Sequence, residues 1–192
     1  MMLEPTEGLQ IVFDRAINIA ESLNHEYITL EHITLSIFSD EKFLEFIKDY
    51  QGSAEFVRAN IEYYVNNNMN DITSDKKIKP QKTHTVERCF NRAFTQVLFN
   101  GRQKIDTTDL LLSILSEKKC HAVYVLNRAG FNKDKFGEYI DTETINVDEE
   151  SFNSSQFDKL LSQFTVNLNQ QAQKNKIDPV IGRDTEVESI IL

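Results

Sequence analysis

Histidine, cysteine and serine are the residue types in this sequence that could supply a metal ligand or a nucleophile. The histidines and cysteines are His25, His32, His84, His121, Cys89 and Cys120. No two of them have the spacing of a zinc motif, so we expect no metal site, although His25 with a nearby acid could hold a surface Zn²⁺. Both cysteines lie within apolar helical patterns, and each is predicted to be a small buried thiol.

Two serines and one arginine recur at a constant distance of 77 residues. The pairs are Ser36 with Ser113, Ser39 with Ser116, and Arg15 with Arg92. A nucleophilic serine needs a histidine and an acid beside it, and the sequence justifies no such arrangement, so we expect no catalytic residue. The serines are interpreted as equivalent positions on two helices. The arginines are expected to form ion pairs or helix caps across the interface between the two repeats.

The recurrence extends over a whole segment of the chain. Residues 13–39 align with residues 90–116 without a gap, Phe13 matches Phe90, and most other apolar positions agree in character. Self-similarity at one fixed offset indicates a duplicated structural unit. Any chemistry of this protein therefore has to be positioned by two copies of the same fold.

Each copy has the apolar spacing of four helices, with Thr6, Thr29 and Asp106 as plausible N-caps. A unit of about 60 residues buries too little surface to be stable alone. We therefore predict an all-α domain over residues 1–141, in which repeats at about 6–66 and 83–141 pack with pseudo-twofold symmetry into eight helices. The polar residues 66–82 between them are expected to form an exposed connecting loop.

The composition changes after residue 141. Residues 142–156 are acidic and rich in Ser, Thr and Asn, which predicts a flexible linker, and residues 157–192 regain an amphipathic pattern. The formal net charge of -9 disfavours binding to nucleic acid or to an anionic membrane. With no apolar run long enough to span a bilayer and no signal peptide, we expect a soluble, cytoplasmic protein.

Two stretches of the sequence carry a resemblance to a known family. The segment FTVNLNQQAQKNKIDPVIGRDTEVESIIL, residues 164–192, resembles the start of the first AAA+ module of Clp/Hsp100 unfoldases. The segment YITLEHITLSIF, residues 27–38, resembles the signature of the N-terminal domain of the same proteins. Residues 100–130 resemble the second repeat of that domain, in its ClpA type more than in ClpB or ClpC.

The resemblance implies an ATP-binding module in residues 157–192 that stops before the phosphate loop. Val180, Ile181, Gly182 and Arg183 would line the adenine side of its nucleotide pocket. The family's Gly-x-x-x-x-Gly-Lys-[Ser/Thr] motif does not occur before Leu192, so we expect no ATP hydrolysis by this chain. ATP and Mg²⁺ are expected as cofactors of a full-length protein, with none bound in this chain.

The resemblance also implies a role in recruiting proteins. Glu26, Glu31, Thr83 and Arg88 match the face that docks a ClpS-type adaptor, although Glu31 could instead be a first-turn acid facing its own helix dipole. The full-length protein would be a hexamer that unfolds tagged or unfolded substrates with ATP and delivers them to the ClpP peptidase. The alternative is a stand-alone, monomeric short form that titrates adaptors or substrates.

Overall fold

The computed structural model describes residues 4–76 and 78–151, with side chains as far as residue 143. The chain divides into two units, Met1–Glu143 and Thr144–Leu192. The first unit contains both repeats. The predicted AAA+ segment, residues 157–192, lies outside the described residues. No helix of the described part combines the length and the apolar character that crossing a bilayer requires.

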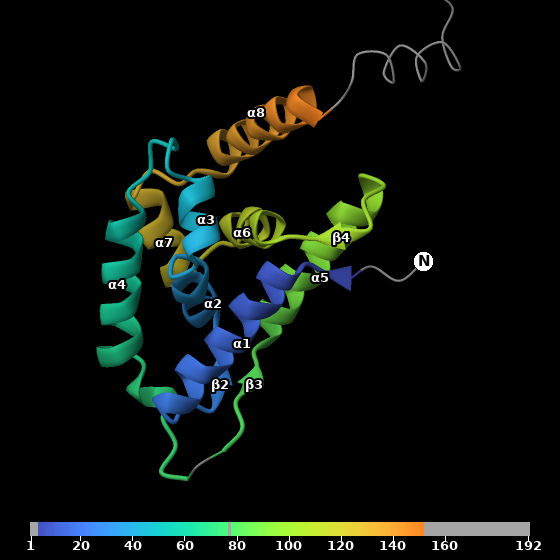
Figure 1. Ribbon diagram of the computed structural model, residues 1–192. Coiled ribbons are helices and arrows are strands. Elements are labelled where there is room, and N and C mark those ends of the chain that lie inside the picture. Colours follow the sequence, from blue (N-terminus) through green and yellow to red (C-terminus); the bar gives the residue numbers. More distant parts are fainter. Residues whose placement is uncertain (1–3, 77, 152–192) are drawn as a thin grey trace, which may run out of the picture. The chain divides into compact units, whose positions relative to one another are not determined.

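The described chain is almost entirely helical, as the sequence predicts (Figure 1). The elements of the first repeat are β1 (Glu4–Pro5), α1 (Glu7–Ser22), β2 (Tyr27–Ile28), α2 (Leu30–Ile37), α3 (Glu41–Phe46) and α4 (Ala54–Asn67). After the short 3₁₀ helix η1 (Asn70–Ile72), the second repeat contains β3 (Gln81–Lys82), α5 (His84–Phe99), β4 (Lys104–Ile105), α6 (Thr107–Leu115), α7 (His121–Arg128) and α8 (Lys133–Ser151).

Side-chain caps fix where the repeated helices begin. The hydroxyl groups of Thr6 and Thr83 accept hydrogen bonds from the third backbone N–H of α1 and α5. Thr29 and Asp106 are the N-caps of α2 and α6, as predicted. The side chains of Thr6, Thr83 and Asp106 each satisfy an N–H that a helix start would otherwise leave unpaired, and α1 and α5 begin with the same local chemistry.

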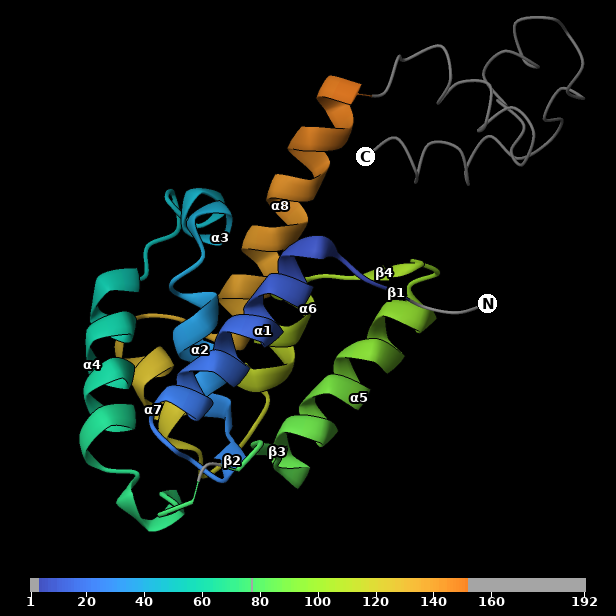
Figure 2. The ribbon, with the colours of Figure 1, turned by 60° about the horizontal axis from the view of Figure 1, so that its bottom comes forward.

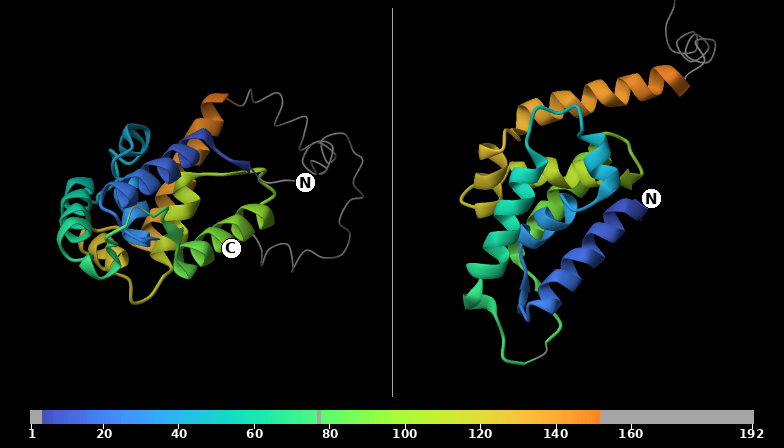
Figure 3. Two further views of the ribbon diagram at one scale, coloured as in Figure 1. Left: turned by 90° about the horizontal axis from the view of Figure 1, so that it is seen from below. Right: turned by 60° about the vertical axis from the view of Figure 1, so that its left-hand side comes forward.

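Helices α2 and α6 form the centre of the domain. Every residue of α2 is buried, and most residues of α6 are buried as well, because other helices surround both of them. Helix α2 contacts α1, α4, α6 and α7, whereas α6 contacts α1, α2, α5 and α7. Helices α4 and α7 lie on the side of the domain away from α5 (Figure 3). The predicted shared core between the repeats is thus made by their second helices.

Two short parallel ladders join the repeats. Strand β1 pairs with β4, and β2 pairs with β3, so the first strand of each repeat pairs with the second strand of the other. One ladder lies near each end of the α1 and α5 pair (Figure 2). Strands of two residues are too short to show an alternating pattern, which is why the sequence does not predict them.

The recurring serines and arginines bind the first helix of each repeat to the second. Ser36 Oγ donates to the Val12 carbonyl and Ser113 Oγ donates to the Cys89 carbonyl, each at 2.7 Å. Arg15 donates to the Ser36 carbonyl at 3.0 Å, and its counterpart Arg92 donates to that of Ser113 at 3.2 Å. The expectation that these arginines bridge the two repeats is therefore wrong, because each arginine binds a carbonyl of its own repeat.

The last helix is longer than the sequence analysis predicts. Helix α8 continues beyond residue 140 to Ser151 and so includes most of the stretch expected to be a flexible linker, residues 142–156. Residues 141–151 contain neither proline nor glycine, so nothing in them ends a helix that is already formed. Polar composition alone was a poor guide here, because helix extension needs only one backbone hydrogen bond per added residue.

Candidate functional site

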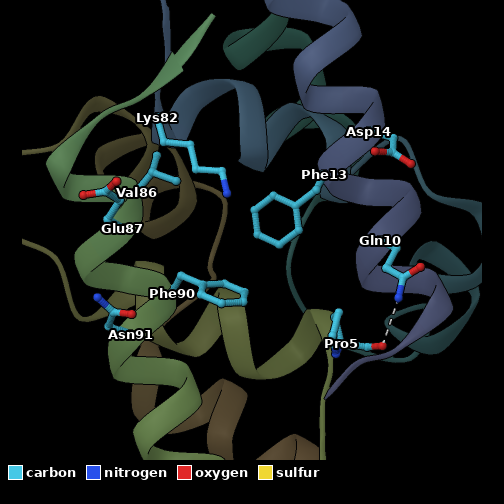
Figure 4. Close-up of a pocket in the computed structure, with 9 residues that line it drawn as sticks. All are labelled: Pro5, Gln10, Phe13, Asp14, Lys82, Val86, Glu87, Phe90 and Asn91. Atoms are coloured by element: carbon cyan, nitrogen blue, oxygen red, sulfur yellow. Dashed lines mark hydrogen bonds between the residues drawn. The ribbon is translucent and has the colours of Figure 1, made fainter. Parts of the chain in front are cut away.

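A groove between α1 and α5 is a candidate binding site in the described part of the domain (Figure 4). Its volume is about 540 Å³, and its lining residues are Pro5, Gln10, Phe13, Asp14, Lys82, Val86, Glu87, Phe90 and Asn91. The rings of Phe13 and Phe90 meet edge to face, with 5.5 Å between their centres. Both rings are half-buried, so the groove offers aromatic surface that the domain's own core does not cover.

The internal duplication builds this groove. Apart from Val86, every lining residue has its repeat-equivalent in the lining as well. The equivalent pairs are Pro5 with Lys82, Gln10 with Glu87, Phe13 with Phe90, and Asp14 with Asn91. Helices α1 and α5 begin from matching caps and present matching faces, so the two phenylalanines meet across the pseudo-twofold axis. The sequence shows the Phe13 and Phe90 match, but we interpreted it only as a mark of the repeat.

The polar groups around the groove differ between its two halves. Lys82 places its Nζ 5.9 Å from the centre of the Phe13 ring, a cation–π distance. On the other side, Gln10 donates to the Pro5 carbonyl at 3.4 Å. The groove thus has a symmetric aromatic centre and an asymmetric rim.

The structure brings together two of the four predicted adaptor-binding residues. The Glu26 carbonyl accepts the Gln81 N–H at 2.9 Å in the ladder between β2 and β3. Thr83 follows that ladder and caps α5. Both therefore lie beside the groove, next to its lining residue Lys82. Arg88 is on the exposed face of α5, where it donates to Glu117 at 2.6 Å.

Glu31 occupies a different place from the one expected. Only 8% of the residue is exposed, so Glu31 offers little surface to the adaptor that the resemblance implies. Its Oε1 accepts the Ala122 N–H at 3.2 Å and the Cys120 thiol at 3.5 Å. Cys120, the N-cap of α7, makes no capping bond itself, and α7 has no acid in its first turn. Glu31 of the first repeat therefore caps a helix of the second.

Replacing Glu31 by alanine is expected to lower the free energy of unfolding by about 1–2 kcal/mol, because the Ala122 N–H would lose its acceptor. Chemical denaturation followed by circular dichroism measures this change. Glu26→Ala is the matched control: its side chain is more exposed, and the expected change is below about 0.5 kcal/mol. Equal losses in the two variants would contradict the capping role.

Glu117 holds the two arginines of α5. Its carboxylate is buried and forms ion pairs with Arg88 and Arg92. The hydrogen bond from Arg88 is the main reason that the pKa of Glu117 falls to about 2, and Arg92 acts in the same direction. Asp40 is the counterpart in the first repeat and pairs with Arg15 at 3.6 Å. Two arginines on one carboxylate therefore distinguish the second repeat from the first.

The histidines form no metal site in the described part of the chain, where no group of three or more possible ligands occurs. His25 is buried, so it cannot be the ligand of a surface Zn²⁺ that the sequence suggested. Its Nδ1 lies 2.9 Å from Nε2 of His32, which is fully buried.

The predicted buried thiol is confirmed for Cys89. Burial raises the pKa of this thiol to about 11. Cys120 is partly buried and stands at the N-cap position of α7 rather than within a helix, and burial raises its pKa to about 12. Both cysteines are free. The predicted adenine-side residues Val180, Ile181, Gly182 and Arg183 lie outside the described residues.

Curated proteins with similar sequences extend well beyond this chain. The ClpA homolog protein of Fuscovulum blasticum is 24% identical over 201 residues, which cover 95% of this chain and 25% of that protein. The ATP-dependent Clp protease ATP-binding subunit ClpA homolog of Trieres chinensis is 22% identical over 204 residues, covering 97% of this chain and 22% of that protein. The chain thus spans about a quarter of the length of these relatives.

Solved structures agree on the fold. The Hsp104 N-terminal domain from Candida albicans matches with a TM-score of 0.61 at 9% identity, over 71% of this chain and 88% of that one. At this identity the match shows the fold alone. The model of the Clp repeat (R) N-terminal domain matches residues 4–129, which is more than half of the sequence. The chain therefore belongs to the Clp repeat N-terminal domain family.

Proposed function

We propose that this chain is the recruiting region of a ClpA-type unfoldase and that its α1–α5 groove binds extended polypeptide segments. The observation that carries the proposal is the Phe13 and Phe90 pair, which leaves aromatic surface half-exposed in a groove of about 540 Å³. Its volume lies in the range of typical binding sites, and it combines aromatic surface with polar groups on the rim. An unfolded segment exposes apolar side chains that a folded protein buries, so such a groove favours unfolded chains.

A ClpS-type adaptor is the second proposed partner. Glu26 and Thr83 beside the β2–β3 ladder, with Arg88 further along α5, would form its docking surface. Glu31 is left out of that surface, because its carboxylate already caps α7. The adaptor surface and the groove share the start of α5, so an adaptor bound there would hold its cargo close to the groove and raise its effective concentration.

The activity of the longer protein is also a proposal. A hexameric, cytoplasmic ATPase would thread the recruited substrate with ATP and Mg²⁺ and deliver it to a ClpP-type peptidase. Support comes from the ClpA homolog names of the relatives and from the AAA+ resemblance of residues 157–192. The contribution of residues 4–143 would be to bind and to present substrate, without chemistry of their own.

The groove is tested by replacing Phe90 with alanine. We expect at least about a tenfold loss of affinity for a labelled, permanently unfolded polypeptide, measured by fluorescence anisotropy, because aromatic anchors at the centre of a site carry most of its binding energy. Phe99→Ala, on the same helix but 86% exposed and outside the groove lining, is the matched control and should bind as the wild type does. Circular dichroism checks that both variants fold.

Unchanged affinity in folded Phe90→Ala, or the same loss in Phe99→Ala, would exclude the groove as the site. Because Phe90 also packs against the core, Phe13→Leu serves as a second variant that keeps most of the apolar volume and removes the ring. A groove that recognises its ligand through aromatic contact predicts a weaker but measurable loss in this variant.

A further inference from the structure

One end of the groove carries a cation that is directed at its aromatic centre. The Lys82 side chain extends toward the Phe13 ring, whereas Asp14 and Glu87 direct their carboxylates away from the two rings (Figure 4). Lys82 takes part in none of the ion pairs found among the described residues. Asp14 and Glu87 also line the groove, but among its charged groups Lys82 is the one directed at the rings, so the charge beside the aromatic centre is positive.

The cation is present at one end only. The repeat-equivalent of Lys82 is Pro5, whose ring carries no charge. The two ends of the groove thus differ in charge, while the Phe13 and Phe90 pair at its centre is the same from either side. A ligand that engages both the rings and the cation has one preferred way to lie in the groove.

The backbone holds Lys82 in place. Strand β3 pairs with β2 in a fixed register, Ile28 opposite Lys82. The backbone N–H groups of Gln81 and Thr83 are already bonded to the carbonyls of Glu26 and Ile28. Any anion at this end must therefore bind the Lys82 ammonium without help from these two amides. This arrangement suits a carboxylate on a side chain better than a chain-terminal carboxylate, which proteins usually hold in a nest of backbone amides.

We propose that Lys82 makes the groove select extended internal segments in which a large apolar side chain is followed or preceded, two positions away, by Asp or Glu. Side chains two positions apart lie on the same face of an extended chain, roughly 6.6 Å apart. The distance of 5.9 Å from Lys82 Nζ to the centre of the Phe13 ring matches that spacing. The apolar side chain packs on the rings while the carboxylate pairs with Lys82. This inference rests on the proposed function, because it specifies which segments the groove prefers.

The test uses short peptides with blocked ends and one central phenylalanine. Both positions two residues from the phenylalanine are Glu in the first peptide, Gln in the second and Lys in the third. We expect the Glu peptide to bind wild-type protein about two- to fivefold more tightly than the Gln peptide, as for a partly exposed ion pair, and the Lys peptide to bind most weakly. The advantage of the Glu peptide should shrink at high salt.

Two variants assign the preference to Lys82. Lys82→Met keeps an apolar stem without the charge, so the Glu and Gln peptides should bind it equally well. Lys82→Glu should reverse the order and favour the Lys peptide. Lys79→Glu is the matched control, an exposed lysine on the same connecting segment but outside the groove lining, and it should keep the wild-type order. A fourth peptide, with glutamines and a free carboxyl-terminus two residues after the phenylalanine, tests the other source of a carboxylate.

The outcomes separate this inference from the proposed function. If none of the peptides binds wild-type protein, the groove does not recruit polypeptides and both fail. If the Glu and Gln peptides bind wild-type protein equally, or if Lys82→Glu keeps the wild-type order, the role of Lys82 is refuted while the groove stands. The proposal would also be overturned if only the fourth peptide bound more tightly than the Gln peptide, because that would show recognition of a chain end.

Discussion

Replacing Phe131 by alanine should lower the free energy of unfolding by about 3–5 kcal/mol, the usual cost of removing a fully buried phenylalanine. Stabilities of single domains lie at about 5–15 kcal/mol, so this one change would remove a large fraction of the total. We expect the variant to unfold at a much lower denaturant concentration than the wild type.

The reason is the position of Phe131 between the repeats. It follows α7 of the second repeat, and its ring packs on Phe38 and Tyr50 of the first, with ring centres 5.0 and 4.9 Å apart. The ring also lies so close to Gly52 that a Cβ added there would come within 2.7 Å of it. Loss of the ring therefore leaves a cavity at a junction of the two repeats, where both are held together.

Chemical denaturation followed by circular dichroism measures the loss, and Phe99→Ala is its matched control. Phe99 is 86% exposed, whereas Phe131 is 0% exposed, so the same substitution at Phe99 should change the free energy of unfolding by less than about 0.5 kcal/mol. Phe131→Leu, which retains more of the volume, should fall in between. A loss below about 1 kcal/mol for Phe131→Ala would show that the cluster does not join the repeats.

The second large effect is a loss of stability in acid, in two separate pH windows. The upper window comes from His32, whose pKa falls from 6.5 to about 4, chiefly through burial and then through the neighbouring His25, while Glu31 opposes the shift. Burial also lowers the pKa of His25. As the pH falls, His32 is therefore protonated in the unfolded chain before it is protonated in the folded chain. The free energy of unfolding decreases as the pH falls from about 6.5 toward about 4.

The hydrogen bonds of His32 also favour its neutral form and so lower its pKa. The Thr29 N–H donates to Nδ1 of His32 at 3.1 Å, so this nitrogen carries no proton. Nε2 must then carry the proton of the neutral ring and donate it to Nδ1 of His25. A second proton on His32 would cost the Thr29 bond and place a charge in the core, which explains why the folded state resists protonation.

The lower window comes from Glu117. Its pKa falls from 4.5 to about 2, so the stabilisation that it contributes is complete above about 4.5 and is lost as the pH falls toward 2. Each window is expected to involve about 1–3 kcal/mol. The value for Glu117 belongs at the lower end of that range, because the side chain of its partner Arg88 is 59% exposed and water screens the pair.

Denaturation curves at a series of pH values measure both windows. His32→Gln should remove most of the upper window, because a glutamine amide can accept and donate hydrogen bonds but does not titrate. Glu117→Gln should remove the lower one. His84→Gln, at a fully exposed position, is the control and should leave both windows as they are. A wild-type pH dependence in His32→Gln would refute the assignment to His32.

The sequence by itself determined the local architecture of this protein. The order of the helices and the N-caps at Thr6, Thr29 and Asp106 depend on residues that are close in the chain, the duplication is visible as self-similarity at one fixed offset, and the structure confirms them. Periodicity and capping are local properties, so they can be recognised without knowing what packs against each helix.

Only the tertiary structure decided the contacts between the repeats. The two ladders between the repeats, the capping of α7 by Glu31 and the meeting of Phe13 with Phe90 join residues about 50–100 positions apart, for which no local pattern exists. Arg15 and Arg92 bind within their own repeats, and the sequence did not show this because their long side chains could reach several partners. A periodic pattern says which face of a helix is buried, but the partner of that face depends on how two copies dock, and docking is settled by the shape and hydrogen bonding of the whole assembly.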